Sequence, residues 1–123
     1  MGQPVVHFEI IGRDGPALQR WYADQFGWQP DANNPMKYGV INRDDNLSPD
    51  GMGIDGGIGE GPDGYEGHIT FYVAVPDVEA ALQKVEAAGG TRMMGPETVM
   101  DDIVIGLFTD PEGHVVGLVT PQM

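Results

Sequence analysis

The feature that most constrains what this chain can fold into is a long internal repeat. Residues 5–11 and residues 67–73 both have the composition of a strand with a histidine near its start, His7 in the first copy and His68 in the second. In each copy a short turn and an amphipathic helix follow, and the helix stops at a glycine. A repeat of this length predicts two modules of one design, with His7 and His68 at equivalent places. If an approximate two-fold axis relates the modules, both histidines point into the space between them.

Each module is predicted to continue after its helix with three more strands. In the first module we expect the helix over residues 16–26 and strands at residues 27–30, 37–42 and 51–59. In the second module we expect the helix over residues 78–88 and strands at residues 91–94, 103–109 and 115–120. The predicted fold class is therefore α+β, with two βαβββ modules, at about residues 4–60 and 66–121, in a single domain of 123 residues.

The net charge of −13 excludes several classes of partner. With 19 acidic against 6 basic residues, the chain would repel both a nucleic-acid backbone and an anionic membrane surface. No apolar run approaches the ~18 residues that a membrane-spanning helix needs, and the N-terminus lacks the features of a secretion signal. The absence of cysteine removes disulfides, thiolate metal ligands and a cysteine nucleophile. We therefore expect a cytoplasmic protein with neither a nucleic-acid nor a membrane partner.

The opening strand of the first module has two different faces. Val6, Phe8 and Ile10 form an apolar face that should pack on the helices. His7 and Glu9 project together from the opposite face, and polar groups on the second face of a strand either meet water or line a cavity. If Glu9 is buried near a histidine, its carboxylate is a candidate general base.

The order of the elements and three stretches of the chain resemble the vicinal oxygen chelate superfamily. The stretches are the opening strand with His7, the end of the first helix at residues 20–28 and the tail at residues 108–118. That superfamily includes glyoxalase I, bleomycin-resistance proteins, fosfomycin-resistance enzymes and extradiol dioxygenases. The resemblance covers nearly the whole chain. It implies a cupped, barrel-like mixed sheet with the helices outside, a ligand or metal site enclosed between the two modules, and a homodimer.

The resemblance also implies metal ligands on the first and last strands of each module. His7 and His68 match the two first-strand positions. On the last strands, where the metal enzymes of the superfamily carry glutamates, this chain has Gly117 in the second module and Gly56 in the first. The sequence therefore keeps two candidate ligands and departs from the pattern at both glutamates.

Two interpretations of the histidines stay open. Glu9, on the same strand face as His7, or Asp55, beside Gly56, would complete a set with His7 and His68 that suits Fe²⁺, Mn²⁺, Ni²⁺ or Zn²⁺. Alternatively, His7, Glu9 and His68 form a hydrogen-bonded polar cluster without a metal. The missing glutamates favour the second interpretation.

Aromatic residues are predicted in two different roles. Those on or beside strands are candidates for the walls of a ligand pocket: Trp28, Tyr38, Tyr72 and Phe108. Those at helical spacing on the first helix are expected in the core between helix and sheet: Trp21, Tyr22 and Phe26.

Three functions are compatible with these features. The first is binding of a small organic ligand in the cavity between the two modules, without a complete metal site. The second is a divalent-metal-dependent lyase, isomerase or dioxygenase that uses His7, His68 and a carboxylate. The third is a non-catalytic, partner-binding domain. The lost glutamates favour the first.

Overall fold

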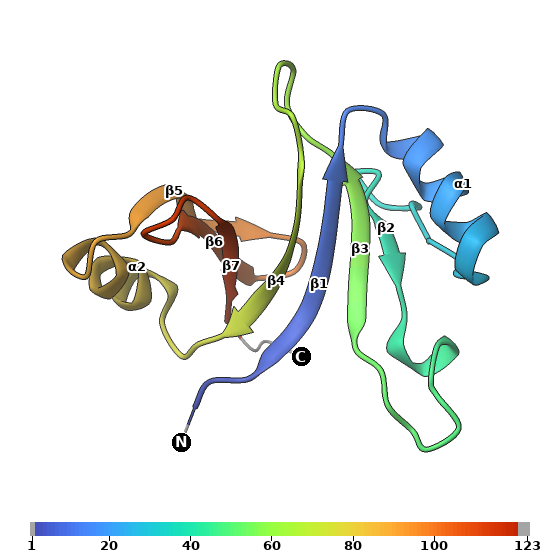
Figure 1. The fold of residues 1–123 in the computed structure, drawn as a ribbon, viewed down its shortest axis with the longest axis horizontal. Coiled ribbons are helices and arrows are strands. Elements are labelled where there is room, and N and C mark those ends of the chain that lie inside the picture. Colours follow the sequence, from blue (N-terminus) through green and yellow to red (C-terminus); the bar gives the residue numbers. More distant parts are fainter. Residues whose placement is uncertain (1, 121–123) are drawn as a thin grey trace. The chain divides into compact units, whose positions relative to one another are not determined.

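The computed structural model describes residues 2–120. Figure 1 shows the elements, which are in chain order β1 (Val5–Gly12), α1 (Gly15–Phe26), β2 (Gly39–Ile41), the short 3-10 helix η1 (Arg43–Asp45), β3 (Asp55–Glu60), β4 (His68–Ala74), α2 (Val78–Ala87), β5 (Thr91–Val99), β6 (Ile103–Thr109) and β7 (Val115–Val119). The chain divides into two units. The first unit is His7–Ile69, and the second unit consists of the residues up to Val6 together with those from Thr70 onward.

In the first unit, β3 lies between β2 and β1. It pairs antiparallel with β2 and parallel with β1, in a register that sets Glu9 beside Gly57 and His7 beside Asp55. One face of these strands is covered by α1 (Figure 1) and holds the buried core of the unit, Ile10, Ile41 and Ile58, against which Phe8, Leu18, Tyr22 and Trp28 pack. The apolar face predicted for β1 is thus confirmed at Phe8 and Ile10.

In the second unit, β7 pairs parallel with β4 and antiparallel with β6, which pairs antiparallel with β5. Both faces of these strands are apolar. The face toward α2 holds a core of Val75, Val78, Leu82 and Leu118. The opposite face holds a core of Tyr72, Ala74, Leu107 and Val119. Each unit therefore combines a helix with parallel and antiparallel strands, which confirms the predicted α+β class.

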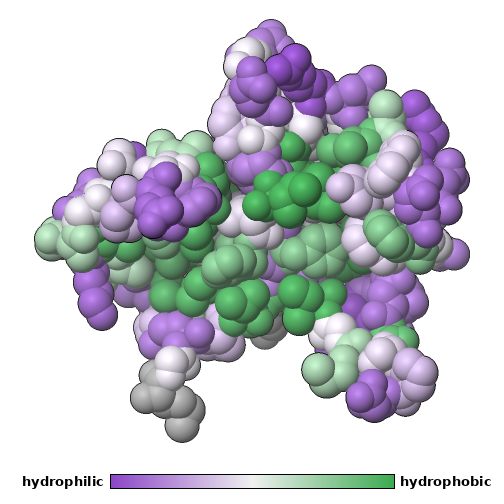
Figure 2. Space-filling view, viewed as in Figure 1, coloured by the Kyte–Doolittle hydropathy of each residue, from purple (hydrophilic) through white to green (hydrophobic). Residues whose placement is uncertain are grey.

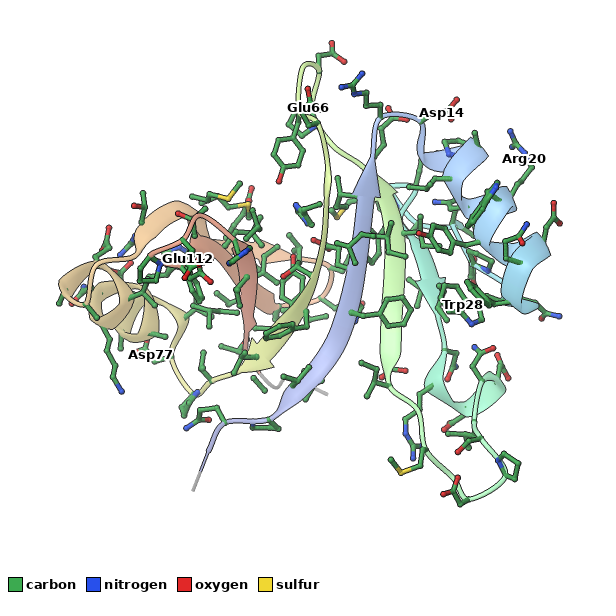
Figure 3. The ribbon with its side chains drawn as sticks, viewed as in Figure 1. Asp14, Arg20, Trp28, Glu66, Asp77 and Glu112 are labelled. Atoms are coloured by element: carbon green, nitrogen blue, oxygen red, sulfur yellow. The ribbon has the colours of Figure 1, made fainter. Side chains whose placement is uncertain are left out.

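Both helices start and stop within one residue of the predicted positions. Asp14 and Asp77, labelled in Figure 3, precede α1 and α2, and each carboxylate accepts a hydrogen bond from a backbone N–H of the first turn, at 3.1 Å in both cases. Gly27 follows α1 with a left-handed φ of 73°, a conformation that glycine adopts without steric cost.

The strand predicted at residues 27–30 is not formed. Gly27 turns the chain at the end of α1 and Pro30 has no N–H to donate, and an isolated antiparallel bridge forms only after this segment, between Asp31 and Val40. Trp28 packs instead on the rings of Phe8 and Tyr22, with centroid distances of 5.4 and 5.8 Å.

Two other strands differ in extent from the prediction. The strand expected at residues 51–59 begins only at Asp55, and Met52 is 68 % exposed. Arg43 explains the late start, because its guanidinium donates to the backbone carbonyls of Gly51 and Gly53 and holds this segment as a loop. In the second unit, β5 runs on to Val99 rather than ending at residue 94.

The aromatic residues of α1 are less buried than their spacing predicts. Trp21 is 54 % exposed and Phe26 is 62 % exposed, so the prediction that they lie in the core is wrong. Only Tyr22 packs against the buried isoleucines. Apolar side chains reach the surface in both units, as Figure 2 shows. None of the helices within residues 2–120 is long and apolar enough to cross a membrane.

Candidate functional site

The polar face predicted for β1 carries a cluster of hydrogen-bonded side chains, all of them within the first unit. Its members, which we call the Glu9 cluster, come from β1, from the residue before β2, from the start of β4 and from the turn before β4: His7, Glu9, Tyr38, His68 and Tyr65. The pairing of β1 with β3 and of β3 with β2 brings Tyr38 close to His7 and Glu9, although these residues are far apart in the sequence.

Two glycines of β3 make room for the cluster. Gly57 is the register partner of Glu9, so no side chain from β3 stands beside this carboxylate. A Cβ atom on Gly57 would lie 2.0 Å from the ring of Tyr38, and one on Gly59 would lie 2.8 Å from it. The Tyr38 ring therefore lies directly on the backbone of β3, which only glycine permits at so close an approach.

Glu9 is the centre of the cluster. It is only 7 % exposed, and both of its carboxylate oxygens accept hydrogen bonds. Oε1 accepts from the Tyr38 hydroxyl at 3.0 Å, and Oε2 accepts from Nε2 of His68 at 2.7 Å. These bonds offset part of the cost of burying a carboxylate.

Two further hydrogen bonds extend the cluster outward. Nε2 of His7 lies 2.8 Å from the Tyr38 hydroxyl, and Nδ1 of His68 lies 2.6 Å from the Tyr65 hydroxyl. The single hydroxyl proton of Tyr38 goes to Glu9, so His7 donates to Tyr38 from Nε2. With both imidazoles neutral, the same reasoning places the proton of His68 on Nε2 and leaves Nδ1 to accept from Tyr65. Each of these four hydrogen bonds is then donated in the direction of the Glu9 carboxylate.

Burial shifts the pKa values of two members of the cluster, His7 and Tyr65. It lowers the pKa of the His7 imidazole below its ordinary value, although the negative charges of Glu9 and Asp55 act in the opposite direction. Burial also raises the pKa of the Tyr65 phenol, and the nearby charge of Glu9 adds to this. Both directions favour a neutral His7 and a protonated Tyr65 near pH 7, as the hydrogen-bond pattern requires.

The other residues predicted at the site are not members of the Glu9 cluster. Asp55 is next to His7 in the register of β3, but it is exposed, and its Oδ1 accepts the backbone N–H of Arg43 at 2.7 Å. Trp28 belongs to the core on the α1 side of the first unit (Figure 3).

Two predicted wall residues belong to the second unit. Tyr72 is 5 % exposed and lies in the core on the face away from α2. Phe108 packs against the core on the α2 side. The structure therefore brings together His7, Glu9, Tyr38 and His68 of the predicted set.

Sequence reasoning missed Tyr65. It lies in the segment interpreted as a linker between the modules, where no periodicity marks a buried side chain. The one available signal was its spacing, three residues before His68 and next to a glycine-rich turn. Tyr38, predicted as an apolar wall, contributes its hydroxyl as much as its ring.

The residues that the resemblance implies as metal ligands do not fit a metal ion in this arrangement. Both ring nitrogens of His68 are hydrogen-bonded, one to Tyr65 and one to Glu9, and Nε2 of His7 is bonded to Tyr38. Within the described part of the chain, no three His, Cys, Asp or Glu side chains come together as a set that could hold a metal.

The chain is similar over most of its length to proteins of one superfamily. The family model described as "Glyoxalase/Bleomycin resistance protein/Dioxygenase superfamily" matches residues 5–118. The chain is also 31 % identical over 106 residues to "Putative glyoxylase CFP32" of Mycobacterium tuberculosis (strain CDC 1551 / Oshkosh) and of Mycobacterium bovis. The match covers 85 % of this chain and 41 % of those proteins, so the chain spans about two fifths of the length of these curated relatives.

Solved structures with the same fold include enzymes of this superfamily. A variant of Streptomyces coelicolor methylmalonyl-CoA epimerase, in complex with 2-nitronate-propionyl-CoA, is similar with a TM-score of 0.63 and 18 % identity, over 98 % of this chain and 99 % of that one. A glyoxalase/bleomycin resistance protein/dioxygenase superfamily member from Vibrio splendidus 12B01 gives a TM-score of 0.60 at 17 % identity, over 97 % and 99 % of the two chains. At such identities the similarity shows the fold.

Proposed function

Because the chain belongs to the glyoxalase/bleomycin resistance protein/dioxygenase superfamily, we propose that it binds a small organic ligand at the Glu9 cluster, through hydrogen bonds rather than through a metal ion. The observation that carries this proposal is the buried carboxylate of Glu9, held by the Tyr38 hydroxyl and the His68 imidazole. Burying a carboxylate costs stability even when its oxygens are hydrogen-bonded. A sheet face that served only packing would not need one.

The charge of the site and of the chain favours a ligand with a cationic or hydrogen-bond-donating group. The Glu9 carboxylate is an acceptor, and the net charge of −13 attracts cations and repels anions. The epimerase structures of similar fold hold acyl-CoA ligands, whose phosphates are anionic. The charge of the present chain argues against a ligand of that kind.

The residues of the cluster have separate roles in this proposal. Glu9 accepts from the donor group of the ligand, while Tyr38 and His68 hold the carboxylate in place. Tyr65 acts through His68, because its hydroxyl bonds Nδ1 and so keeps the proton on Nε2. Tyr65 is therefore a positioning residue.

A ligand screen with paired variants tests this function. Ligand-observed NMR would be run with three classes of compound: aromatic cations, neutral donors and anionic acyl thioesters. Binders would then be titrated calorimetrically into the wild type, Glu9→Gln and the matched control Glu112→Gln, which makes the same chemical change on an exposed turn of the second unit. We expect Glu9→Gln to weaken binding about tenfold or more, as expected for loss of a charged hydrogen bond. Equal affinity in all three proteins, or binding of the anionic class alone, would contradict the proposal.

A second candidate function is proton abstraction by Glu9. It is favoured by the backing of this carboxylate by His68 and then Tyr65, which resembles an acid–base relay. Glu9 would take a proton from the carbon next to a carbonyl, the electron pair would move to the carbonyl oxygen, and delivery of a proton to the opposite face of that carbon, with return of the electron pair, would complete an epimerisation. Incorporation of solvent deuterium into carbonyl compounds, lost in Glu9→Gln, is the expected result; its absence across the binders would exclude this step.

The homodimer implied by the resemblance is also a proposal. The exposed aromatic residues of α1, Trp21 and Phe26, support it, because both are in ring contact with Tyr22 and contiguous exposed apolar surface indicates an interaction site. Sedimentation equilibrium should give twice the mass of the chain. A monomer mass that does not change with concentration would refute it.

A further inference from the structure

We propose that Tyr38 is the residue that determines the kind of site formed in the first unit: its ring fills the space that a ligand side chain from β3 would need in order to join His7, Glu9 and His68 around a divalent cation. The inference rests on the proposed function in that both concern the Glu9 cluster. It goes further by naming the residue that replaces a metal site with a hydrogen-bonding one.

The register of β3 leaves one position beside Glu9 from which such a ligand could come, because the carboxylate of Asp55 lies beside His7 and accepts the backbone N–H of Arg43. Positions 55, 57 and 59 share the face of His7 and Glu9, whereas positions 56 and 58 face α1. Gly56, where the resemblance places a glutamate, is thus on the wrong face, and a Cβ there would lie 2.1 Å from the Phe8 ring. Gly57, beside Glu9, is the position from which a carboxylate could reach the cluster.

Tyr38 and a side chain at position 57 exclude each other. A Cβ on Gly57 would come within 2.0 to 2.3 Å of three atoms of the phenol, including its oxygen. No rotation of a longer side chain avoids this overlap, because it begins at the Cβ itself. As long as the Tyr38 ring stays in place, β3 can contribute no ligand next to Glu9.

The Tyr38 hydroxyl also occupies the atoms that a cation would use. It bonds Nε2 of His7 at 2.8 Å and Oε1 of Glu9 at 3.0 Å. A metal ion needs the lone pair of an imidazole nitrogen, but Nε2 of His7 carries the proton that it donates to Tyr38. A neutral phenol thus links two groups that a cation would otherwise bridge.

The second unit repeats this arrangement independently. Tyr72 is the register partner of Gly117, and a Cβ on Gly117 would lie 2.6 Å from the Tyr72 ring. Gly117 is the other position where the resemblance places a glutamate. In both units a tyrosine ring therefore lies on a glycine of the strand that would have supplied the carboxylate.

Metal titrations of Tyr38 variants test the inference. The variants are Tyr38→Ala, which removes the ring, Tyr38→Phe, which keeps the ring, and Tyr38→Ala combined with Gly57→Asp, which adds a carboxylate. Co²⁺ is the probe, followed by its visible absorption and by calorimetry, with circular dichroism to confirm folding. We expect weak binding by the wild type and Tyr38→Phe, binding about tenfold tighter by Tyr38→Ala, and one tightly bound Co²⁺ per chain in the double variant, lost when His68→Ala is added.

Three results would overturn the inference. The first is a wild type that binds one Co²⁺ as tightly as the double variant and loses it in Glu9→Gln. The second is Tyr38→Phe that binds as tightly as Tyr38→Ala. The third is a folded Tyr38→Ala variant that binds Co²⁺ with the affinity of the wild type. Because this single variant is informative by itself, the test remains decisive if the double variant does not fold. None of these results depends on finding an organic ligand, so failure here is distinguishable from failure of the proposed function.

Discussion

In the first unit, the sheet face away from α1 carries the buried Glu9 and its hydrogen-bond partners, whereas in the second unit the face away from α2 carries Tyr72, Ala74, Leu107 and Val119. The faces toward the helices are alike, because the buried core of each consists of aliphatic residues with aromatic rings packed against it. The two units therefore share the packing of the helix on the sheet and differ in the sheet face that points away from the helix. On that face the first unit holds a buried polar cluster, and the second unit holds a buried apolar core.

The comparison predicts first that the helix-side cores are equally important for stability. Ile58 and Leu82 are both 0 % exposed, one in each unit. Ile58→Ala and Leu82→Ala should each lower the free energy of unfolding by about 3 kcal/mol, since each leaves a cavity in a packed core. Urea unfolding followed by circular dichroism measures both. A loss confined to one of the two variants would show that the units do not contribute alike.

The second prediction concerns the contact of Tyr38 with Gly57. Gly57→Ala should lower the free energy of unfolding by about 2 kcal/mol, because the added methyl overlaps the Tyr38 ring. In the Tyr38→Ala background the same substitution should have little effect. Gly2→Ala is the control, since a Cβ there meets nothing within 4 Å. An equal loss in both backgrounds would mean that the ring does not lie on β3.

Third, the first unit should make stability depend on pH near neutrality. Burial lowers the pKa of His7 in the folded state, so below the unfolded value of 6.5 the unfolded chain binds a proton that the folded chain resists. Stability should fall as pH decreases from about 7 toward the lowered pKa of His7. His7→Gln should flatten this part of the profile. A wild type with an equally flat profile from pH 7 to 5 would contradict the burial of a neutral His7.

In the second unit, the Glu79 carboxyl should add a pH dependence in acid. Hydrogen bonds from Arg92 lower the pKa of the Glu79 carboxyl from 4.5 to about 2. Because Glu79 is exposed, its contribution is small, and it is lost as pH falls from 4.5 toward about 2. Glu79→Gln should reduce the slope in that range and leave the slope near pH 6 unchanged. A changed slope near neutrality would mean that the two titrations are not separate.

Much of the fold could be predicted because strong local signals mark it. The ends of α1 and α2 were predicted to within one residue. The signals were the helical periodicity, the aspartate caps and the glycine after α1. The alternation along β1 separated Phe8 and Ile10 from His7 and Glu9. The errors lie where long-range contacts decide. The Arg43 guanidinium holds residues 51–53 out of β3, and packing on Phe8 draws Trp28 away from a strand.

The candidate site was predictable in part for the same reason. His7 and Glu9 share a strand face, and the repeat pointed to His68. Two contacts could not be predicted: the Tyr38 ring on Gly57 and the hydrogen bond of Tyr65 to His68. They depend on the register of β3 with β1 and on the course of two loops, and neither of these produces a periodic pattern in the sequence. The same register moved Gly56 to the α1 side, which pattern matching along the chain had no means to show.

The most direct test of a metal-free, hydrogen-bonded site is long-range ¹H–¹⁵N NMR of the imidazole rings near pH 7, before and after addition of Zn²⁺. The chain has 3 histidines, and the exposed His114, paired with Asp110, serves as the internal control. Our account predicts that His7 and His68 both carry a proton on Nε2 and that Zn²⁺ leaves their signals unchanged. Protons on Nδ1, or a shift of the Nε2 signals of both rings on addition of stoichiometric Zn²⁺, would contradict it.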